Sequence, residues 1–205
     1  MTVMQNTKYQ AVECGDCNTC GKCFNREQEG TLYTMLIYSE NQAGILNQIT
    51  AVFTRRQVNI ESLNVCASST PGVHKYTITC FCQEEMAKML TKQIEKKIDV
   101  LQARYYTSDE IFTIEVALLK VSTPVMLQDQ RAGLIIQDLG ARIVEVNPTF
   151  AIVEKKGRTE EILQLYERLN AVGAVLQFVR SGHIAVTKST VEQLDQYLAR
   201  REQNK

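Results

Sequence analysis

Four cysteines at regular spacing give the sharpest chemical signal in the sequence: Cys14, Cys17, Cys20 and Cys23. Thiols in such a run could bind zinc or an iron–sulfur cluster. However, structural zinc sites usually separate two C-x2-C pairs by a longer loop, and bacterial iron–sulfur runs end in a cysteine three residues on, followed by proline. Three alternatives therefore stay open: a metal or cluster site, a disordered tail with incidental or redox-active thiols, or another role.

A short polar turn ahead of a predicted helix is the second place where chemistry is expected. Asn41 can cap that helix, because its side-chain oxygen can accept a bond from an amide of the first turn. Gly44 lacks a side chain, so a ligand can approach the backbone there, and the free amides of a helix N-terminus attract a carboxylate. Either the turn binds a carboxylate, or Asn41 only caps the helix and Gly44 only relieves crowding.

Regular apolar patterns on both sides of this turn predict the elements that position it. Residues 32–38 form an apolar and β-branched run of strand length. After the turn, four apolar residues fall on one face of a helix: Ile45, Ile49, Val52 and Phe53. The chain then predicts a strand at 58–66, a turn at 68–72, a strand at 73–82, a helix at 84–97 and a strand at 98–106. This order is the βαββαβ plan of a ferredoxin-like domain.

The same order of elements then repeats. We expect a strand at 110–121, a helix at 122–139 that Pro124 starts and Gly140 ends, strands at 141–146 and 149–153, a helix at 158–170 and a strand at 174–179. A short strand at 184–187 and a terminal helix at 191–201 follow. The sequence thus predicts an α+β protein with two tandem ferredoxin-like domains, at 31–107 and 110–190. A Cys-rich extension at 1–30 precedes them, and a terminal helix or tail at 191–205 follows.

Composition excludes several classes of function. The 23 basic and 23 acidic residues balance, which argues against nucleic-acid binding. No apolar run has membrane-spanning length and the N-terminus lacks a signal peptide's apolar core, so we expect a cytoplasmic protein without a membrane partner. The third predicted strand places Cys80 and Cys82 on its apolar face, as small core residues. The chain has only two histidines, His74, expected to be solvated, and His183, expected in a turn, and no nucleophile arrangement, which argues against an enzyme.

Two runs resemble a known family: residues 40–46, Glu-Asn-Gln-Ala-Gly-Ile-Leu, and residues 59–63, Asn-Ile-Glu-Ser-Leu. Together they are similar to the ACT domain of the small, regulatory subunit of acetolactate synthase. Residues 141–146 and 180–186 look like stretches of that family's C-terminal, ACT-like domain. The resemblance covers roughly residues 32–188 and leaves the four-cysteine run unexplained.

The resemblance implies a non-catalytic subunit that activates the large, catalytic subunit and confers feedback inhibition by valine or another branched-chain amino acid. It implies a homodimer formed through the ACT domains, with the effector between them. It also implies no cofactor in this subunit, and thiamine diphosphate, magnesium and flavin adenine dinucleotide in the catalytic partner. By position, the effector-binding residues would be Asn41, Gly44, Ile45 and Leu46 of one chain and Asn59 and Ile60 of the facing chain.

A second hypothesis is a stand-alone ACT-type amino-acid sensor. Its Cys-rich tail would respond to a metal or to redox state. A thiamine-dependent large subunit encoded next to this chain would favour the first hypothesis.

Overall fold

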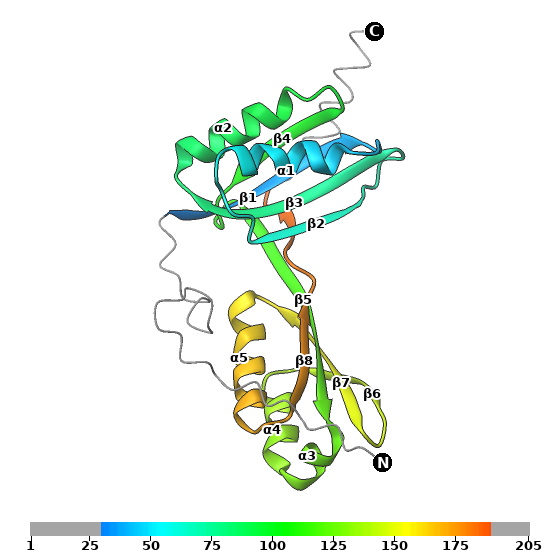
Figure 1. Cartoon of the computed structure of the whole chain (residues 1–205). Helices are drawn as coiled ribbons and strands as arrows, with labels where there is room; N and C mark the ends of the chain where they lie inside the picture. The colour runs from blue at the N-terminus through cyan, green and yellow to red at the C-terminus, as the bar shows by residue number, and fades with distance from the viewer. Residues whose placement is uncertain (1–29, 190–205) are drawn as a thin grey trace, which may run out of the picture.

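Two α+β domains follow each other along the chain and are joined by a long strand paired with a second, shorter one (Figure 1). The structure is a computed structural model that describes residues 30–189. The first domain contains β1 (Thr31–Glu40), α1 (Ile45–Arg55), β2 (Ser62–Ala67), β3 (Val73–Cys82), α2 (Glu84–Glu95) and β4 (Val100–Tyr106). The second contains β5 (Ile111–Ser122), α3 (Thr123–Gln128), α4 (Gln130–Asp138), β6 (Arg142–Val146), β7 (Phe150–Gly157), α5 (Thr159–Ala171) and β8 (Val175–Arg180), and is followed by β9 (Ile184–Thr187).

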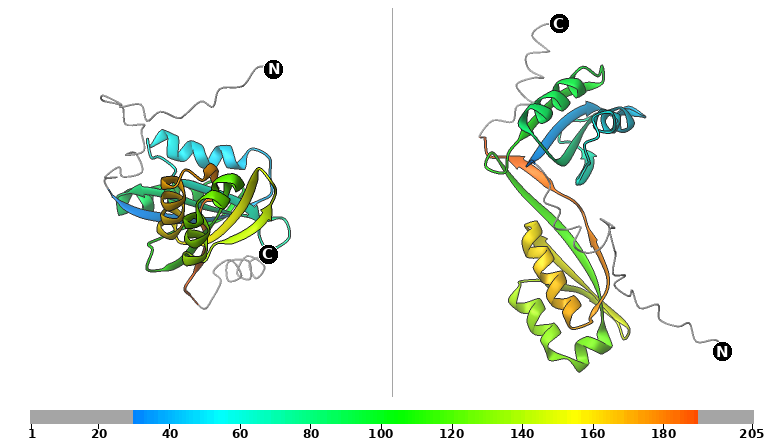
Figure 2. Two further views of the ribbon diagram at one scale, coloured as in Figure 1. Left: turned by 90° about the horizontal axis from the view of Figure 1, so that it is seen from below. Right: turned by 60° about the vertical axis from the view of Figure 1, so that its left-hand side comes forward.

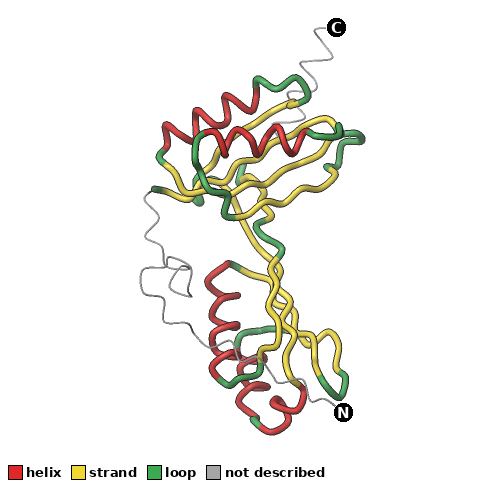
Figure 3. Tube along the Cα trace, in the orientation of Figure 1, coloured by secondary structure: helices red, strands yellow, loops and turns green. Residues whose placement is uncertain are grey.

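The two domains share one sheet topology. The strand orders are β2-β3-β1-β4 and β6-β7-β5-β8, and the paired strands are antiparallel. In each domain the helices cover one face of the sheet, as the red and yellow segments of Figure 3 show. The prediction of an α+β fold with two tandem ferredoxin-like domains is therefore confirmed.

The apolar face predicted for α1 is the face that the helix buries. Ile45, Ile49, Val52 and Phe53 are each at most 4% exposed and pack into the core of the first domain. Burying a side chain as large as that of Phe53 contributes roughly 1.5–3 kcal/mol. β3 contributes Ile78 to the same core, together with Cys80 and Cys82, so the prediction of small core residues at these two positions is confirmed.

The second domain differs from the sequence prediction in its first helix. Where one helix was expected at 122–139, α3 and α4 are separated at Asp129, which has an extended backbone and accepts a hydrogen bond from the amide of Arg131. Asp129 thereby caps a new helix, a local interaction that the apolar period does not reveal.

The strand expected at 58–66 begins only at Ser62, because Gln57 has a positive φ of 55° and the amide of Val58 bonds back to Phe53. The helix expected at 191–201 lies outside the described residues.

β5 belongs to both halves of the molecule. Its first residues, Ile111 to Ile114, pair with β9, and residues 115 to 122 pair with β7. Figure 2 shows β5 and β9 running together into the first domain. There Ile111 and Ala185 pack with Leu36 of β1, and Lys75 Nζ donates to the carbonyl of Ala185 at 3.0 Å. The β5–β9 ribbon therefore holds the two domains together.

Candidate functional site

The turn before α1 places glycine, not asparagine, at the helix N-cap. Gly44 has a φ of 87° and makes no side-chain cap, so the expectation that Asn41 caps the helix is wrong. Asn41 is held instead through its backbone, whose amide donates to the carbonyl of Gly72 at 3.0 Å. Its side chain is exposed and makes no hydrogen bond to another described residue. The Asn41 carboxamide is thus free to bind a ligand.

The N-terminus of α1 has the properties of a carboxylate-binding site. A Cβ added at Gly44 would meet nothing within 4 Å, so the backbone is open to a ligand. The first-turn amides of Leu46 and Asn47 have no acceptor within the helix, and they lie at its positive end. The Ile45 side chain is 1% exposed and its amide donates to the carbonyl of Gln42 at 3.5 Å, whereas Leu46 is 41% exposed. The geometry supports binding of a small anion by Asn41 and these amides.

Asn59 and Ile60 lie beyond the other end of the same helix. Asn59 lines a cavity of about 520 Å³ whose walls also include Glu61, Met86 and Met89. α1 has 11 residues and is therefore about 16 Å long, which separates Asn59 from Asn41 by more than the length of an amino acid. Within one protomer, the structure does not bring the two groups of predicted residues together.

β2 connects the two groups along the edge of the sheet. Its only partner in the four-stranded sheet is β3, so the other edge of β2 is unpaired within residues 30–189. His74 of β3 pairs with both Ala67 of β2 and Ser39 of β1. The C-terminal end of β2 therefore lies at the same end of the sheet as Asn41, and its N-terminal end lies beside Asn59.

The remaining thiols in the described part of the chain do not form a metal centre. Cys66 is exposed, and the Sγ atoms of Cys80 and Cys82 lie 4.0 Å apart in the core. The hydrogen bond between the two thiols raises the pKa of Cys80, which burial raises further, and lowers the pKa of Cys82. No group of three or more histidine, cysteine or acidic side chains within residues 30–189 is placed to hold a metal. The candidate ligands Cys14, Cys17, Cys20 and Cys23 lie outside the described residues.

Sequence reasoning missed a polar contact between the two domains. The Oγ of Ser62, the first residue of β2, lies 3.2 Å from Nδ1 of His183. The opposite ring nitrogen of His183 lies 3.3 Å from Oε1 of Glu115. No local pattern marks these residues as partners, because 121 positions separate Ser62 from His183.

Two family models match the chain, one for each domain. The model described as "AHAS small subunit-like ACT domain" matches residues 35–102. The model described as "Small subunit of acetolactate synthase" matches residues 114–189. The four-cysteine run lies outside both ranges.

Curated relatives carry the same description. The acetolactate synthase small subunit of Bacillus subtilis is 34% identical over 151 residues, which are 73% of this chain and 87% of the relative. The probable acetolactate synthase small subunit of Methanothermobacter thermautotrophicus is 30% identical over 166 residues, which are 80% of this chain and 97% of the relative. Both matches are longer than either domain and therefore extend over parts of both.

A solved structure shares the fold of both domains. The acetolactate synthase small subunit from Thermotoga maritima superimposes with a TM-score of 0.70 and 22% identity, over 78% of this chain and 99% of that chain.

Within residues 30–189, every helix is too short or too polar to cross a membrane.

Proposed function

The chain belongs to the family of acetolactate synthase small subunits, and from this premise we propose that it binds valine or another branched-chain amino acid between two ACT domains. As a small subunit it is a non-catalytic, regulatory component of acetolactate synthase in branched-chain amino-acid biosynthesis, and it associates with the large, catalytic subunit. In our proposal it raises the activity of that subunit, and the bound amino acid reverses this effect.

In this proposal the large, catalytic subunit carries out the reaction. Pyruvate is decarboxylated and its two-carbon unit is transferred to a second 2-oxo acid. Thiamine diphosphate, magnesium and flavin adenine dinucleotide would all belong to the catalytic subunit. This chain would contribute no cofactor and would act only through its contacts.

A homodimer formed through the unpaired edge of β2 would assemble the effector site. If two β2 strands pair antiparallel, the N-terminal end of one strand lies beside the C-terminal end of the other. Asn41 lies at the end of the sheet where β2 terminates, and Asn59 precedes its start. Such pairing would therefore bring Asn59 and Ile60 of the partner chain towards Asn41. The separation of Asn41 and Asn59 by the length of α1 is the observation that carries this proposal. If both residues bind the same amino acid, they must come from two different chains.

The two halves of this site suit the two charges of an amino acid. Asn41 and the backbone at Gly44, Ile45 and Leu46 would hold the carboxylate. Asn59 and Ile60 of the facing chain would receive the ammonium group and part of the side chain. A buried charge must be paired, so a site with separate donors and acceptors selects a zwitterion over a simple carboxylic acid.

The test is acetolactate formation by the cognate large subunit with and without this protein, across a valine titration. Stimulation that valine reverses would support the proposal, and isovalerate, which is valine without the ammonium group, should have no effect. Failure to bind or stimulate the large subunit would contradict it. A stand-alone amino-acid sensor would then be the better account, and the metal content of the anaerobically purified chain would be measured next.

A further inference from the structure

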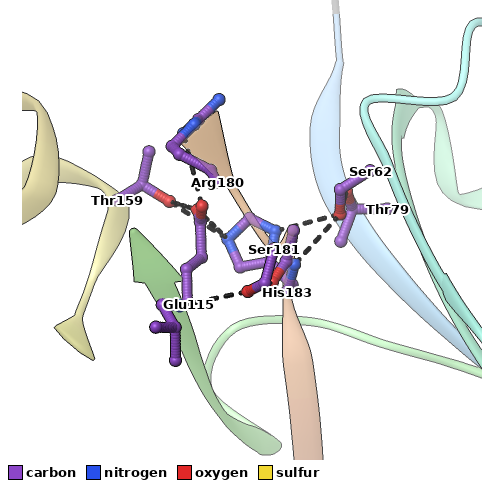
Figure 4. Close-up of polar contacts among 9 residues, drawn as sticks. Ser62, Thr79, Glu115, Thr159, Arg180, Ser181 and His183 are labelled. Atoms are coloured by element: carbon purple, nitrogen blue, oxygen red, sulfur yellow. Dashed lines mark hydrogen bonds and ion pairs between the residues drawn. The ribbon is translucent and has the colours of Figure 1, made fainter. Parts of the chain in front are cut away.

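A histidine lies at the junction of the two domains and contacts both (Figure 4). On the first-domain side, the Oγ of Ser62 lies 3.2 Å from Nδ1 of His183 and also accepts from the His183 amide at 3.4 Å. The same Oγ lies 2.7 Å from the hydroxyl of Thr79, which is fully buried in β3. The imidazole is therefore anchored to the sheet of the first domain through one hydroxyl.

On the second-domain side, the other ring nitrogen meets a buried carboxylate. His183 Nε2 lies 3.3 Å from Oε1 of Glu115 and 3.1 Å from Oγ1 of Thr159, which itself donates to Glu115. The Glu115 side chain is 2% exposed, and its second oxygen lies 3.4 Å from Arg180 Nη1. Glu115 is on β5, Thr159 begins α5 and Arg180 ends β8, so three elements of the second domain converge on this carboxylate.

Ser62 lies next to the segment proposed to bind the effector, so a bound ligand can change its position. It follows Asn59, Ile60 and Glu61 directly, and the amide of Glu61 donates to the carbonyl of Thr79 at 2.8 Å. The proposed ammonium-binding segment and Ser62 therefore share one support on β3. A shift of this segment by a bound ligand would move the Ser62 hydroxyl relative to His183.

We propose that His183 couples occupancy of the Asn59–Ile60 segment to the orientation of the second domain. The coupling rests on the proposed function, because it needs an effector at that segment. The effector favours one position of Ser62, and His183 moves with Ser62 because the two are hydrogen-bonded. His183 also contacts Glu115 and Thr159, so its movement changes the orientation of the second domain. A ligand can drive this change only through a difference in its affinity for the two arrangements, and the Ser62–His183 contact supplies that difference.

Amide hydrogen exchange of the full-length chain tests the coupling. We compare wild type, His183→Gln and His183→Ala with His74→Ala, the matched control at the other histidine, which is half-buried on β3. Without ligand, exchange of the segment 180–184 should rise at least about fivefold in both His183 variants and stay unchanged in the control. Exchange in the two hydrophobic cores should match wild type in all four proteins, which shows that the domains remain folded.

Valine completes the test. In wild type and His74→Ala, valine should slow exchange at 59–62 and change it at 114–117 and 180–184. In the His183 variants valine should still slow exchange at 59–62, and its effect should be confined to the first domain. With the large subunit present, these variants should still bind valine but lose most of the inhibition. Equal valine effects on the second domain in His183→Gln and wild type would overturn the coupling.

The outcome is separable from that of the proposed function. If valine leaves segment 59–62 of the wild type unchanged, the proposed effector is wrong. The exchange rates of the ligand-free proteins then test whether His183 holds the two domains together. His183 variants that exchange like His74→Ala at 180–184 overturn this role, and faster exchange supports it.

Discussion

Gly182 approaches Ser62 so closely that a Cβ at position 182 would lie 3.2 Å from the Cβ of Ser62. Gly182 also has a φ of 75°, which side-chain-bearing residues rarely adopt. The residue before His183 is therefore pressed against the first residue of β2, and the contact between the domains tolerates little bulk.

Gly182→Ala should destabilise the chain more than Gly173→Ala. Gly173 has a similar φ of 68° but no atom within 4 Å of an added Cβ, so its variant should lose only about 1 kcal/mol from backbone strain. Gly182→Ala carries the same strain and must also displace Ser62, which we expect to cost about 1 kcal/mol more. Urea unfolding of both variants measures the difference. Equal losses would mean that the segment between β8 and β9 moves away from β2 without a cost in stability.

Arg180→Ala should destabilise the protein more than Glu115→Gln. Removing the guanidinium leaves the Glu115 carboxylate, whose side chain is 2% exposed, without the cation at 3.4 Å, a loss of about 3 kcal/mol. Glu115→Gln keeps a polar group of the same shape and removes the buried charge, so its cost should be about 1 kcal/mol. Thermal unfolding compares the two. The reverse order would show that the interaction with Arg180 does not stabilise the buried charge.

Asn41→Ala should raise the valine concentration needed for half-inhibition about tenfold, the equivalent of about 1.4 kcal/mol. The reason is the loss of one hydrogen bond to a charged carboxylate, since the Asn41 side chain is exposed and does not cap α1. Activation of the large subunit without valine should be unchanged. Asn170→Ala, at an exposed asparagine on α5 of the second domain, is the control and should behave like wild type. Full valine sensitivity in Asn41→Ala would refute the assignment.

Mixing two variants that each weaken the feedback should restore part of it. If each effector site takes Asn41 from one chain and Asn59 from the other, a mixed dimer of Asn41→Ala and Asn59→Ala contains one intact site and one doubly altered site. After equal amounts of the two variants are unfolded and refolded together, about half of the dimers are mixed, so valine inhibition should recover towards about a quarter of the wild-type extent. Each variant refolded alone is the control. No recovery, with mixed dimers verified by mass spectrometry, would mean that both residues act within one chain.

The parts of the fold that were predicted correctly rest on local patterns. The spacing of Ile45, Ile49, Val52 and Phe53 defines a buried helix face, and the alternation through Ile78 and Cys80 defines β3. The helix at 122–139 was predicted too long because the Asp129 side chain caps a new helix at that point. A single hydrogen bond of this kind leaves no trace in the apolar period.

The junction of the domains could not be predicted, for a different reason. The sequence indicated a short strand at 184–187 but not its partner, since β9 returns to the first residues of β5. His183 was expected in a turn, and it does lie between two strands, yet its role follows from side chains that only the tertiary fold brings together. The effector residues on either side of α1 were expected from a family resemblance and remain predictions.

The β5–β9 ribbon sets the kind of motion that the molecule can perform. A strand is already nearly fully extended, so the ribbon resists stretching, and its ladder of hydrogen bonds resists sliding. A two-stranded ribbon twists readily about its own axis, however. The β5–β9 ribbon therefore favours rotation of one domain relative to the other over any change in their separation.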